Sequence, residues 1–174
     1  GATVDNFSAQ AATGVTSFND TFSGSSLGSG WQLQAGQFSA QGGTLRAGTG
    51  GLNLATLTGA AQANVSVQAD ITLGAGQWAG LVSRSSANGD MYFANWFSYN
   101  GDYYVSIFKS VNGAWTLLNQ SAVSLGAGTM RFDAIGSSLS VTINGVLAVS
   151  ATDSSIASGV SGIRAGAGGT GPAV

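Results

Sequence analysis

The 174-residue sequence predicts an all-β fold of two packed antiparallel sheets, and three observations support this prediction. The chain contains 28 Gly, which interrupt nearly every stretch of ten residues. Good helix formers are scarce, because there is one Lys and no Glu, while Gly costs about 1 kcal/mol in a helix interior and supplies the positive φ of tight turns. Apolar and polar residues alternate with a period of two, and short turn sequences separate the alternating segments.

The two flanks of the chain are rich in Gly and Ala and differ from the rest. Residues 1–14 are interpreted as a linker or an N-terminal strand extension, and residues 167–174 as a flexible C-terminal linker. Residues 15–166 then form one sandwich domain, which is long enough to bury a core.

The clearest strand covers Asn64–Leu73, a long element at about 3.3 Å per residue. Its predicted core face carries Val65, Val67, Ala69, Ile71 and Leu73. The clearest hairpin joins Ser138–Ile143 to Val146–Ala151 through Asn144-Gly145, which is the preferred two-residue type I′ turn.

Further strands follow from the same alternation between turn sequences. They are predicted at Val15–Phe22, Trp31–Ala35, Gln37–Ala40, Thr44–Ala47, Leu52–Leu57, Gln77–Arg84, Met91–Tyr99, Tyr103–Val111, Trp115–Ser121, Thr129–Ala134 and Gly162–Ala165. About a dozen strands joined by short hairpins favour antiparallel sheets. A parallel β-helix has the same composition, but the fixed coil repeat that it requires is absent from this sequence.

The composition excludes several classes of function. His and Cys are absent, so the chain has no imidazole base, no thiolate nucleophile and no usual zinc or iron site. The net charge is −2 with five scattered basic residues, so no nucleic-acid partner is expected. No apolar run reaches the roughly 18 residues of a membrane helix, so no membrane insertion is expected. Without Glu, sugar hydrolysis would need two Asp brought together, and we expect no enzyme activity.

The polar surface predicted for this chain consists of Ser, Thr, Asn, Gln and Gly rather than charged residues. Such a surface, acidic and free of Cys, is common in large proteins that bacteria export. The chain is therefore predicted to be extracellular or at the cell surface, in a bacterial or phage protein, rather than cytosolic.

Several short motifs follow one another along the chain. FNDTFSG and LGSGW occur within residues 18–48, AGLVSRSSANGDMYFA occupies 79–94, and VSIFKSVNGAWTLLN occupies 105–119. SLSVTING and a final D-x-x-x-x-x-G-x-x-G-x-R segment lie within 130–166. This order resembles the concanavalin A-like or laminin G-like jelly-roll modules of bacterial exoproteins and phage tail proteins.

The resemblance implies a concanavalin A-like jelly roll that serves as an extracellular module, often one of several in a long protein. Such modules frequently bind glycans or other ligands and often carry a structural calcium ion. Some relatives hydrolyse polysaccharides through paired glutamates, and because this chain has no Glu that activity is not carried over.

The hairpin between residues 91 and 115 contains nine of the sixteen aromatic residues. Alternation along residues 91–99 places one set of side chains on each face, namely Tyr92, Ala94, Trp96 and Ser98 against Phe93, Asn95, Phe97 and Tyr99. Along residues 103–111, Val105 and Ile107 are expected to face the core, which directs Tyr104, Ser106 and Phe108 outward. Neither face is polar, so either both faces are covered or one face binds a ligand.

Aromatic rings stack on the apolar faces of sugars, while amides and carboxylates beside them bind hydroxyl groups. The candidate ligand-binding residues are therefore Trp96, Tyr99, Tyr104, Trp115, Asn95, Asn100 and Asp102. The alternative is that these rings fill the space between the two sheets, because aromatic side chains dominate cores.

Two of the seven Asp match positions that recur in the family. Asp20 lies in the FNDTFSG motif and Asp153 in the final segment, and one structural calcium ion is expected to join them. The alternative is that these are turn residues whose carboxylates accept backbone hydrogen bonds.

The predicted function is a non-catalytic extracellular carbohydrate-binding or adhesion module. Its expected partners are a glycan or polysaccharide and the neighbouring domains of a larger exoprotein. The alternative is a structural or assembly module, a spacer or a fibre subunit without a small ligand, because few charges and prolines protect its sheet edges.

Overall fold

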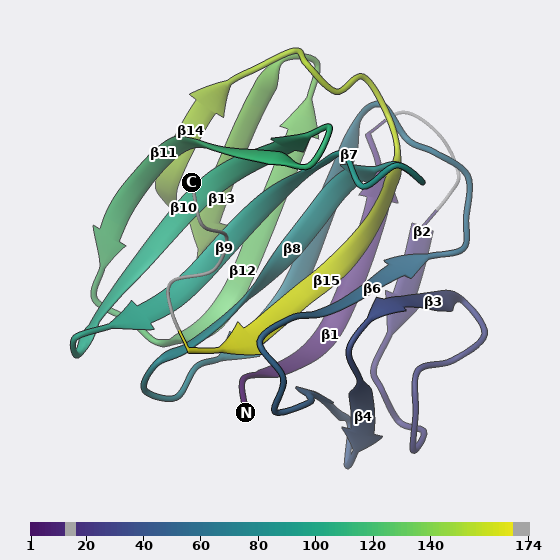
Figure 1. The fold of residues 1–174 in the computed structure, drawn as a ribbon, viewed down its shortest axis with the longest axis vertical. Helices are drawn as coiled ribbons and strands as arrows, with labels where there is room; N and C mark the ends of the chain where they lie inside the picture. The colour runs from purple at the N-terminus through teal and green to yellow at the C-terminus, as the bar shows by residue number, and fades with distance from the viewer. Residues whose placement is uncertain (13–16, 169–174) are drawn as a thin grey trace.

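The computed structural model describes residues 1–12 and 17–168, which form a two-layer sandwich of antiparallel sheets (Figure 1). One sheet has eight strands: β1 (Thr3–Ala11), β2 (Ser17–Asp20), β4 (Phe38–Gln41), β5 (Thr44–Ala47), β7 (Val65–Thr72), β12 (Ala127–Ile135), β13 (Ser138–Ile143) and β14 (Val146–Thr152). The other has seven: β3 (Trp31–Ala35), β6 (Asn53–Leu57), β8 (Gln77–Ser85), β9 (Met91–Tyr99), β10 (Asp102–Val111), β11 (Ala114–Val123) and β15 (Val160–Ala167).

The strand order in the eight-stranded sheet is β14-β13-β12-β7-β1-β5-β4, with β2 paired to β1. The order in the seven-stranded sheet is β11-β10-β9-β8-β15-β6-β3. The predicted two-sheet antiparallel sandwich is therefore confirmed. Among the described residues, no helix is long and apolar enough to cross a membrane.

Asn-Gly pairs close three of the hairpins, because both central residues of a type I′ turn need positive φ. Both residues have positive φ in each of the pairs Asn100-Gly101, Asn112-Gly113 and Asn144-Gly145. Asn100 therefore has a clear structural role in joining β9 to β10.

The N-terminal segment lies inside the sheet, and the sandwich begins before residue 15. β1 pairs with β7 on one side and with β5 on the other, and its Val4 and Phe7 are 2% and 0% exposed. A bulge shifts the register between Asp5 and Ser8, and Asn6 within it has φ of 48°. This extra residue breaks the period-two alternation, which explains why the sequence pattern alone did not show a regular strand.

Two of the predicted boundaries fall at the limits of the described residues. β2 covers Ser17–Asp20 of the strand predicted at Val15–Phe22, and residues 15 and 16 lie outside the described residues. Two residues of the predicted C-terminal linker belong to the described structure. Ala167 is the last residue of β15, and the Gly168 N–H donates a hydrogen bond to the Gly76 carbonyl at 2.9 Å. Residues 169–174 lie outside the described residues.

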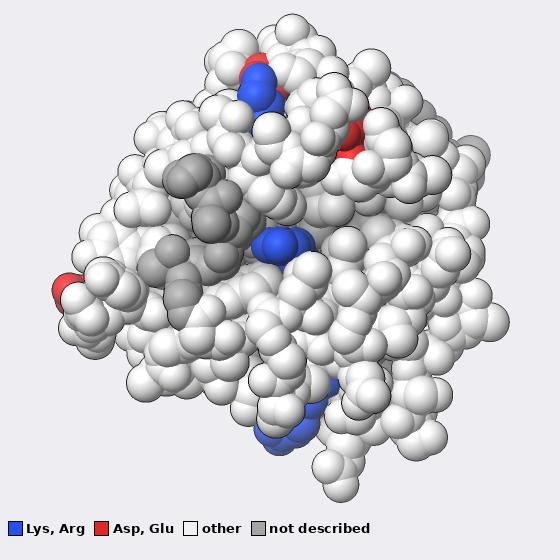
Figure 2. All heavy atoms as spheres, viewed as in Figure 1, with Lys and Arg blue, Asp and Glu red and all other residues white. Residues whose placement is uncertain are grey.

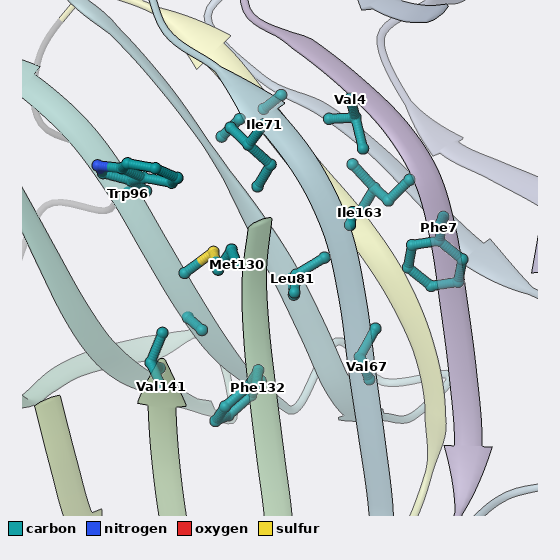
Figure 3. Packing of buried hydrophobic residues seen from close by; sticks show 14 of the residues in the cluster. Val4, Phe7, Val67, Ile71, Leu81, Trp96, Met130, Phe132, Val141 and Ile163 are labelled. Atoms are coloured by element: carbon teal, nitrogen blue, oxygen red, sulfur yellow. The ribbon is translucent and has the colours of Figure 1, made fainter. Parts of the chain in front are cut away.

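The main core fills the space between the two sheets (Figure 3). All five apolar side chains predicted for the core face of residues 64–73 are at most 6% exposed. Trp96 and Leu81 come from the seven-stranded sheet and meet Met130 and Phe132 of the eight-stranded sheet in the same cluster. Because this core uses one face of each sheet, the opposite face of the seven-stranded sheet is left for other contacts.

Candidate functional site

A second apolar cluster lies on the face of the seven-stranded sheet that is turned away from the core, here called the outer face. This outer-face cluster consists of Trp78, Val82, Met91, Phe93, Phe97 and Phe108, with Leu54, Tyr104 and Trp115 packed against it. Its members come from four adjacent strands, β8 to β11, and from β6. Figure 1 views the molecule from this side, with β15, β8 and β9 in front.

The alternation of β9 and β10 produces this second cluster. Phe93 and Phe97 point to the outer face, while Trp96 between them points to the core. On β10, Val105 lies in the core, whereas Phe108 belongs to the outer-face cluster, as predicted. The six residues of the cluster are at most 5% exposed, whereas Tyr104 and Trp115, which pack against it, are partly exposed.

Arg164 of β15 occupies the middle of this cluster. Its guanidinium carbon lies 5.0 Å from the ring centroid of Trp78, 5.0 Å from that of Phe93 and 4.7 Å from that of Trp115. Arg164 is opposite Gly80 in the pairing of β15 with β8, so no side chain on β8 stands between the guanidinium and the rings of β9. Cation–π attraction from three rings holds the charged group in place.

Burial lowers the pKa of Arg164 to about 10, because removal from water disfavours the charged form of the guanidinium. Arg164 is 8% exposed, and at neutral pH it stays charged. Figure 2 shows a basic group in a hollow near the middle of this face. The site therefore combines a recessed cation with flat apolar rings.

Two partly exposed aromatic residues border the cluster on the side of β10 and β11. Tyr104 stacks on Phe97 with a centroid distance of 5.3 Å and an interplanar angle of 20°. Trp115 meets Phe93 edge-on at 6.3 Å, and Tyr99 at the end of β9 is 51% exposed. These rings offer apolar surface that a ligand can reach.

A polar groove of about 590 Å³ runs along the same face near β3 and β6. Its lining includes Gln32, Gln34, Thr56, Ser85 and Met91, the last of which also belongs to the outer-face cluster. The Gln34 side-chain amide donates to the Thr56 hydroxyl at 3.0 Å. Amide and hydroxyl groups of this kind bind sugar hydroxyls, and here they lie at the opposite edge of the sheet from β11, which carries Trp115.

The placement of Trp96 in an exposed binding platform is corrected by the structure. Its ring is fully buried in the main core, and its Nε1–H donates to the Leu125 carbonyl at 3.0 Å (Figure 3). Alternation had placed Trp96 and Tyr99 on opposite faces, so they could not belong to one platform. Trp96 is a core residue.

The other predicted ligand-binding residues fall into two groups. Tyr99, Tyr104 and Trp115 lie on the outer face. Asn95 shares this face but is fully buried between Gly80 of β8 and Ser106 of β10, beneath the surface that a ligand would touch. The exposed Asn100 and Asp102 lie at the β9–β10 hairpin, where Asn100 serves the turn.

The two Asp predicted to share a calcium ion are engaged separately by protein groups. Asp20 accepts hydrogen bonds from the Phe22 N–H and from Trp31 Nε1–H, both at 2.8 Å. Asp153 pairs with Lys109 Nζ at 2.6 Å and accepts from the Tyr92 hydroxyl at 2.6 Å. Within residues 1–12 and 17–168, no three acidic side chains form a group that could hold a metal ion.

Burial alone would raise the pKa of the Asp153 carboxyl. The hydrogen bonds from Lys109, Tyr92 and Ser155 outweigh burial and hold that pKa well below its usual value. The pKa of Tyr92 is raised to about 12 by burial and by its hydrogen bond to Asp153, so this phenol remains a donor. The network joins β9 and β10 to the segment that follows β14.

The sequence reasoning missed Arg164, Trp78, Phe93, Phe97 and Phe108 as members of the site. The signal for Arg164 was present, because it is a single charged residue between Ile163 and Ala165 in an otherwise small and apolar strand. Its aromatic neighbours come from three other strands, so their proximity depends on the strand order and could not be read locally.

Comparison with known proteins finds no matching family model and no matching curated protein. The structure is similar to the carbohydrate binding module CBM66 from Bacillus subtilis, with a TM-score of 0.69, 20% identity and coverage of 78% of this chain and 86% of that chain. It is also similar to the GH43 protein BlXynB from Bacillus licheniformis, with a TM-score of 0.64, 18% identity and coverage of 88% and 36%. The apo Crh5 transglycosylase gives a TM-score of 0.56, 14% identity and coverage of 83% and 65%.

This chain therefore corresponds to most of CBM66 but to only part of BlXynB and of Crh5. The similarity confirms the predicted fold class, an all-β sandwich of the concanavalin A-like jelly-roll type. Fold and site together define a jelly-roll sandwich with a recessed cation and aromatic groups on the outer face of one sheet.

Proposed function

We propose that this chain is a non-catalytic carbohydrate-binding module that works outside the cell or at the cell surface. It binds a glycan on the outer face of the seven-stranded sheet. The observation that carries the proposal is the outer-face cluster, where Tyr104 and Trp115 are partly exposed and Trp115 lies beside the recessed Arg164. The shared fold with CBM66, which is named as a carbohydrate binding module, supports it.

The chemistry of the face suits a sugar ring. A pyranose presents a patch of C–H groups that packs on an aromatic ring, and its hydroxyl groups need donors and acceptors at the edge. Trp115 and Tyr104 supply rings on β11 and β10, and a longer glycan that crosses the sheet would meet the amide and hydroxyl groups of Gln32, Gln34 and Thr56 on β3 and β6. The site therefore offers both kinds of contact on one face.

The proposal of a non-catalytic role rests on the composition of the cluster. The chain has no Glu, and the charged group that lies among the aromatic rings of the outer face is the guanidinium of Arg164. Glycoside hydrolysis uses a pair of carboxylates as acid and base or nucleophile. The outer-face cluster thus provides surfaces for binding rather than groups for proton transfer.

The test is a binding screen against soluble and insoluble polysaccharides, by affinity electrophoresis and by pull-down. Trp115→Ala is expected to weaken binding at least tenfold, which corresponds to about 1.4 kcal/mol. Ile135→Ala is the matched control, because Ile135 is an exposed apolar residue (40%) on β12 of the other sheet. Binding that survives Trp115→Ala, or that Ile135→Ala weakens equally, would contradict this site.

An assembly role is the second candidate, and one observation favours it. Val146 and Leu147 are 71% and 61% exposed on β14, which is an edge strand of the eight-stranded sheet. Exposed apolar residues on a free edge can pair with another strand. If assembly is the function, light scattering will show a mass that rises with concentration, and Leu147→Asp will restore the monomer.

A further inference from the structure

We propose that the glycan bound on the outer face carries an oxyanion, a carboxylate or a sulfate ester, which Arg164 recognises. This inference rests on the proposed carbohydrate-binding function and names the class of sugar that fits the site.

The first argument is the unmatched hydrogen-bonding capacity of Arg164. The Nη1 atom is buried and has no hydrogen-bond partner. Among the described residues no carboxylate pairs with this guanidinium, whose neighbours are the rings of Trp78, Phe93 and Trp115. Aromatic rings stabilise the charge but do not accept directed hydrogen bonds as an oxyanion does.

The second argument is the contrast with Arg84, the other buried arginine. Arg84 is 2% exposed, and it donates to the carbonyl oxygens of Ala63, Ile156 and Gly136 at 2.7 to 2.9 Å. Its donors are used to hold loops together. Arg164 is 8% exposed without such acceptors. A buried N–H group without an acceptor is unfavourable in the free protein, and the Nη1 of Arg164 is such a group, so it favours a role in binding.

The third argument is the shape and charge of the face. A guanidinium is planar and presents parallel N–H groups that match the two oxygens of a carboxylate or sulfate. Trp115 borders Arg164, so a sugar ring packed on Trp115 would bring its substituent to the guanidinium. The protein as a whole carries a net charge of −2, so attraction to a polyanion depends on this local cation.

The test compares matched polysaccharides by isothermal titration calorimetry. One pair is a polyuronate and the same polymer after chemical reduction of its carboxyl groups, and the other is a sulfated galactan and its desulfated form. The wild type is expected to bind the acidic member of one pair at least tenfold more tightly, and the pair that shows the preference identifies the oxyanion. Equal affinity for acidic and neutral members would overturn this inference while leaving the carbohydrate-binding function intact. Failure to bind any glycan would overturn both.

Variants connect the preference to the residue. Arg164→Met is expected to bind both members of the pair equally, through the aromatic rings alone, whereas Arg164→Lys keeps part of the preference because it keeps the charge. Arg46→Gln, which removes an exposed arginine on β5, is the control and should leave the preference unchanged. If the melting curve shows that Arg164→Met does not fold, Arg164→Lys serves as the test. An unchanged ratio of affinities for the acidic and neutral polysaccharides in Arg164→Lys would contradict a contact that uses two N–H groups of the guanidinium.

Discussion

Asp153→Asn is expected to destabilise the protein by about 2 kcal/mol at neutral pH, because Asp153 connects two strands to the segment after β14. Its Oδ2 pairs with Lys109 Nζ at 2.6 Å, and its Oδ1 accepts from the Tyr92 hydroxyl at 2.6 Å and from the Ser155 N–H at 2.8 Å. Tyr92 in turn accepts from the Ile156 N–H at 3.2 Å. Asparagine keeps the shape of this network but removes its negative charge.

The magnitude follows from the burial of the pair. The Lys109 and Asp153 side chains are 23% and 11% exposed. Exposed ion pairs contribute about 0–1 kcal/mol, whereas breaking a fully buried pair costs about 3–5 kcal/mol. An intermediate value of about 2 kcal/mol is expected here, which lowers Tm by roughly 4–8 °C for a domain of this size.

The effect of pH has a defined sign. The pKa of the Asp153 carboxyl is lower in the folded protein than in the unfolded chain, so this group contributes stability above its unfolded pKa, near 4. That contribution is lost as the pH falls through the folded pKa, because the folded state must then take up the proton as well. The difference in unfolding free energy between wild type and Asp153→Asn should therefore shrink below about pH 4.

Urea unfolding followed by tryptophan fluorescence at pH 7 and pH 3 measures both quantities. Asp102→Asn is the control, since Asp102 is exposed at a hairpin, and its change should stay within about 0.5 kcal/mol. A loss below 0.5 kcal/mol for Asp153→Asn at pH 7, or an equal loss at both pH values, would refute the assigned role of the Lys109–Asp153 pair.

Three further results are expected. Trp96→Ala should cost about 3–5 kcal/mol in urea unfolding, because its fully buried ring leaves a cavity between the sheets, and a loss under 1 kcal/mol would remove Trp96 from the core. Gly80→Ala should prevent folding or lower Tm strongly, because a Cβ at that position would lie 1.8 Å from the Ala94 carbonyl oxygen of β9, and an unchanged melting curve would show that β8 and β9 pair differently. EDTA should leave the melting temperature unchanged, because protein donors already engage the carboxylates of Asp20 and Asp153, and a fall in Tm that added calcium reverses would restore the ion site.

Local patterns in the sequence were enough to predict most strands and the two-sheet class. The alternation of β7 and the Asn-Gly turns depend on neighbouring residues alone, and the structure confirms both. β1 was not distinguished from a linker, because the bulge at Asn6 moves Phe7 out of the alternation that begins at Val4. A single extra residue thus hid a strand that lies inside the eight-stranded sheet.

The candidate site was only partly predictable, for a physical reason. Alternation separates Trp96 from Phe97 correctly, but both faces of β9 are apolar, so the pattern does not say which face meets the other sheet. The decision depends on strand order, which also brings Arg164 of β15 to Trp78 of β8 and Trp115 of β11. Such long-range contacts leave no local signature in the sequence.

The most direct test of glycan binding on the outer face is an NMR titration that follows the four indole N–H signals, assigned with single Trp→Phe variants. The best ligand from the polysaccharide screen, as a short oligosaccharide, is expected to shift the signal of Trp115. Trp96 and Trp31, whose indole N–H groups donate to Leu125 and Asp20 inside the protein, should stay in place. A ligand that binds while the Trp115 signal remains unshifted would contradict the assignment of the outer face as the binding site.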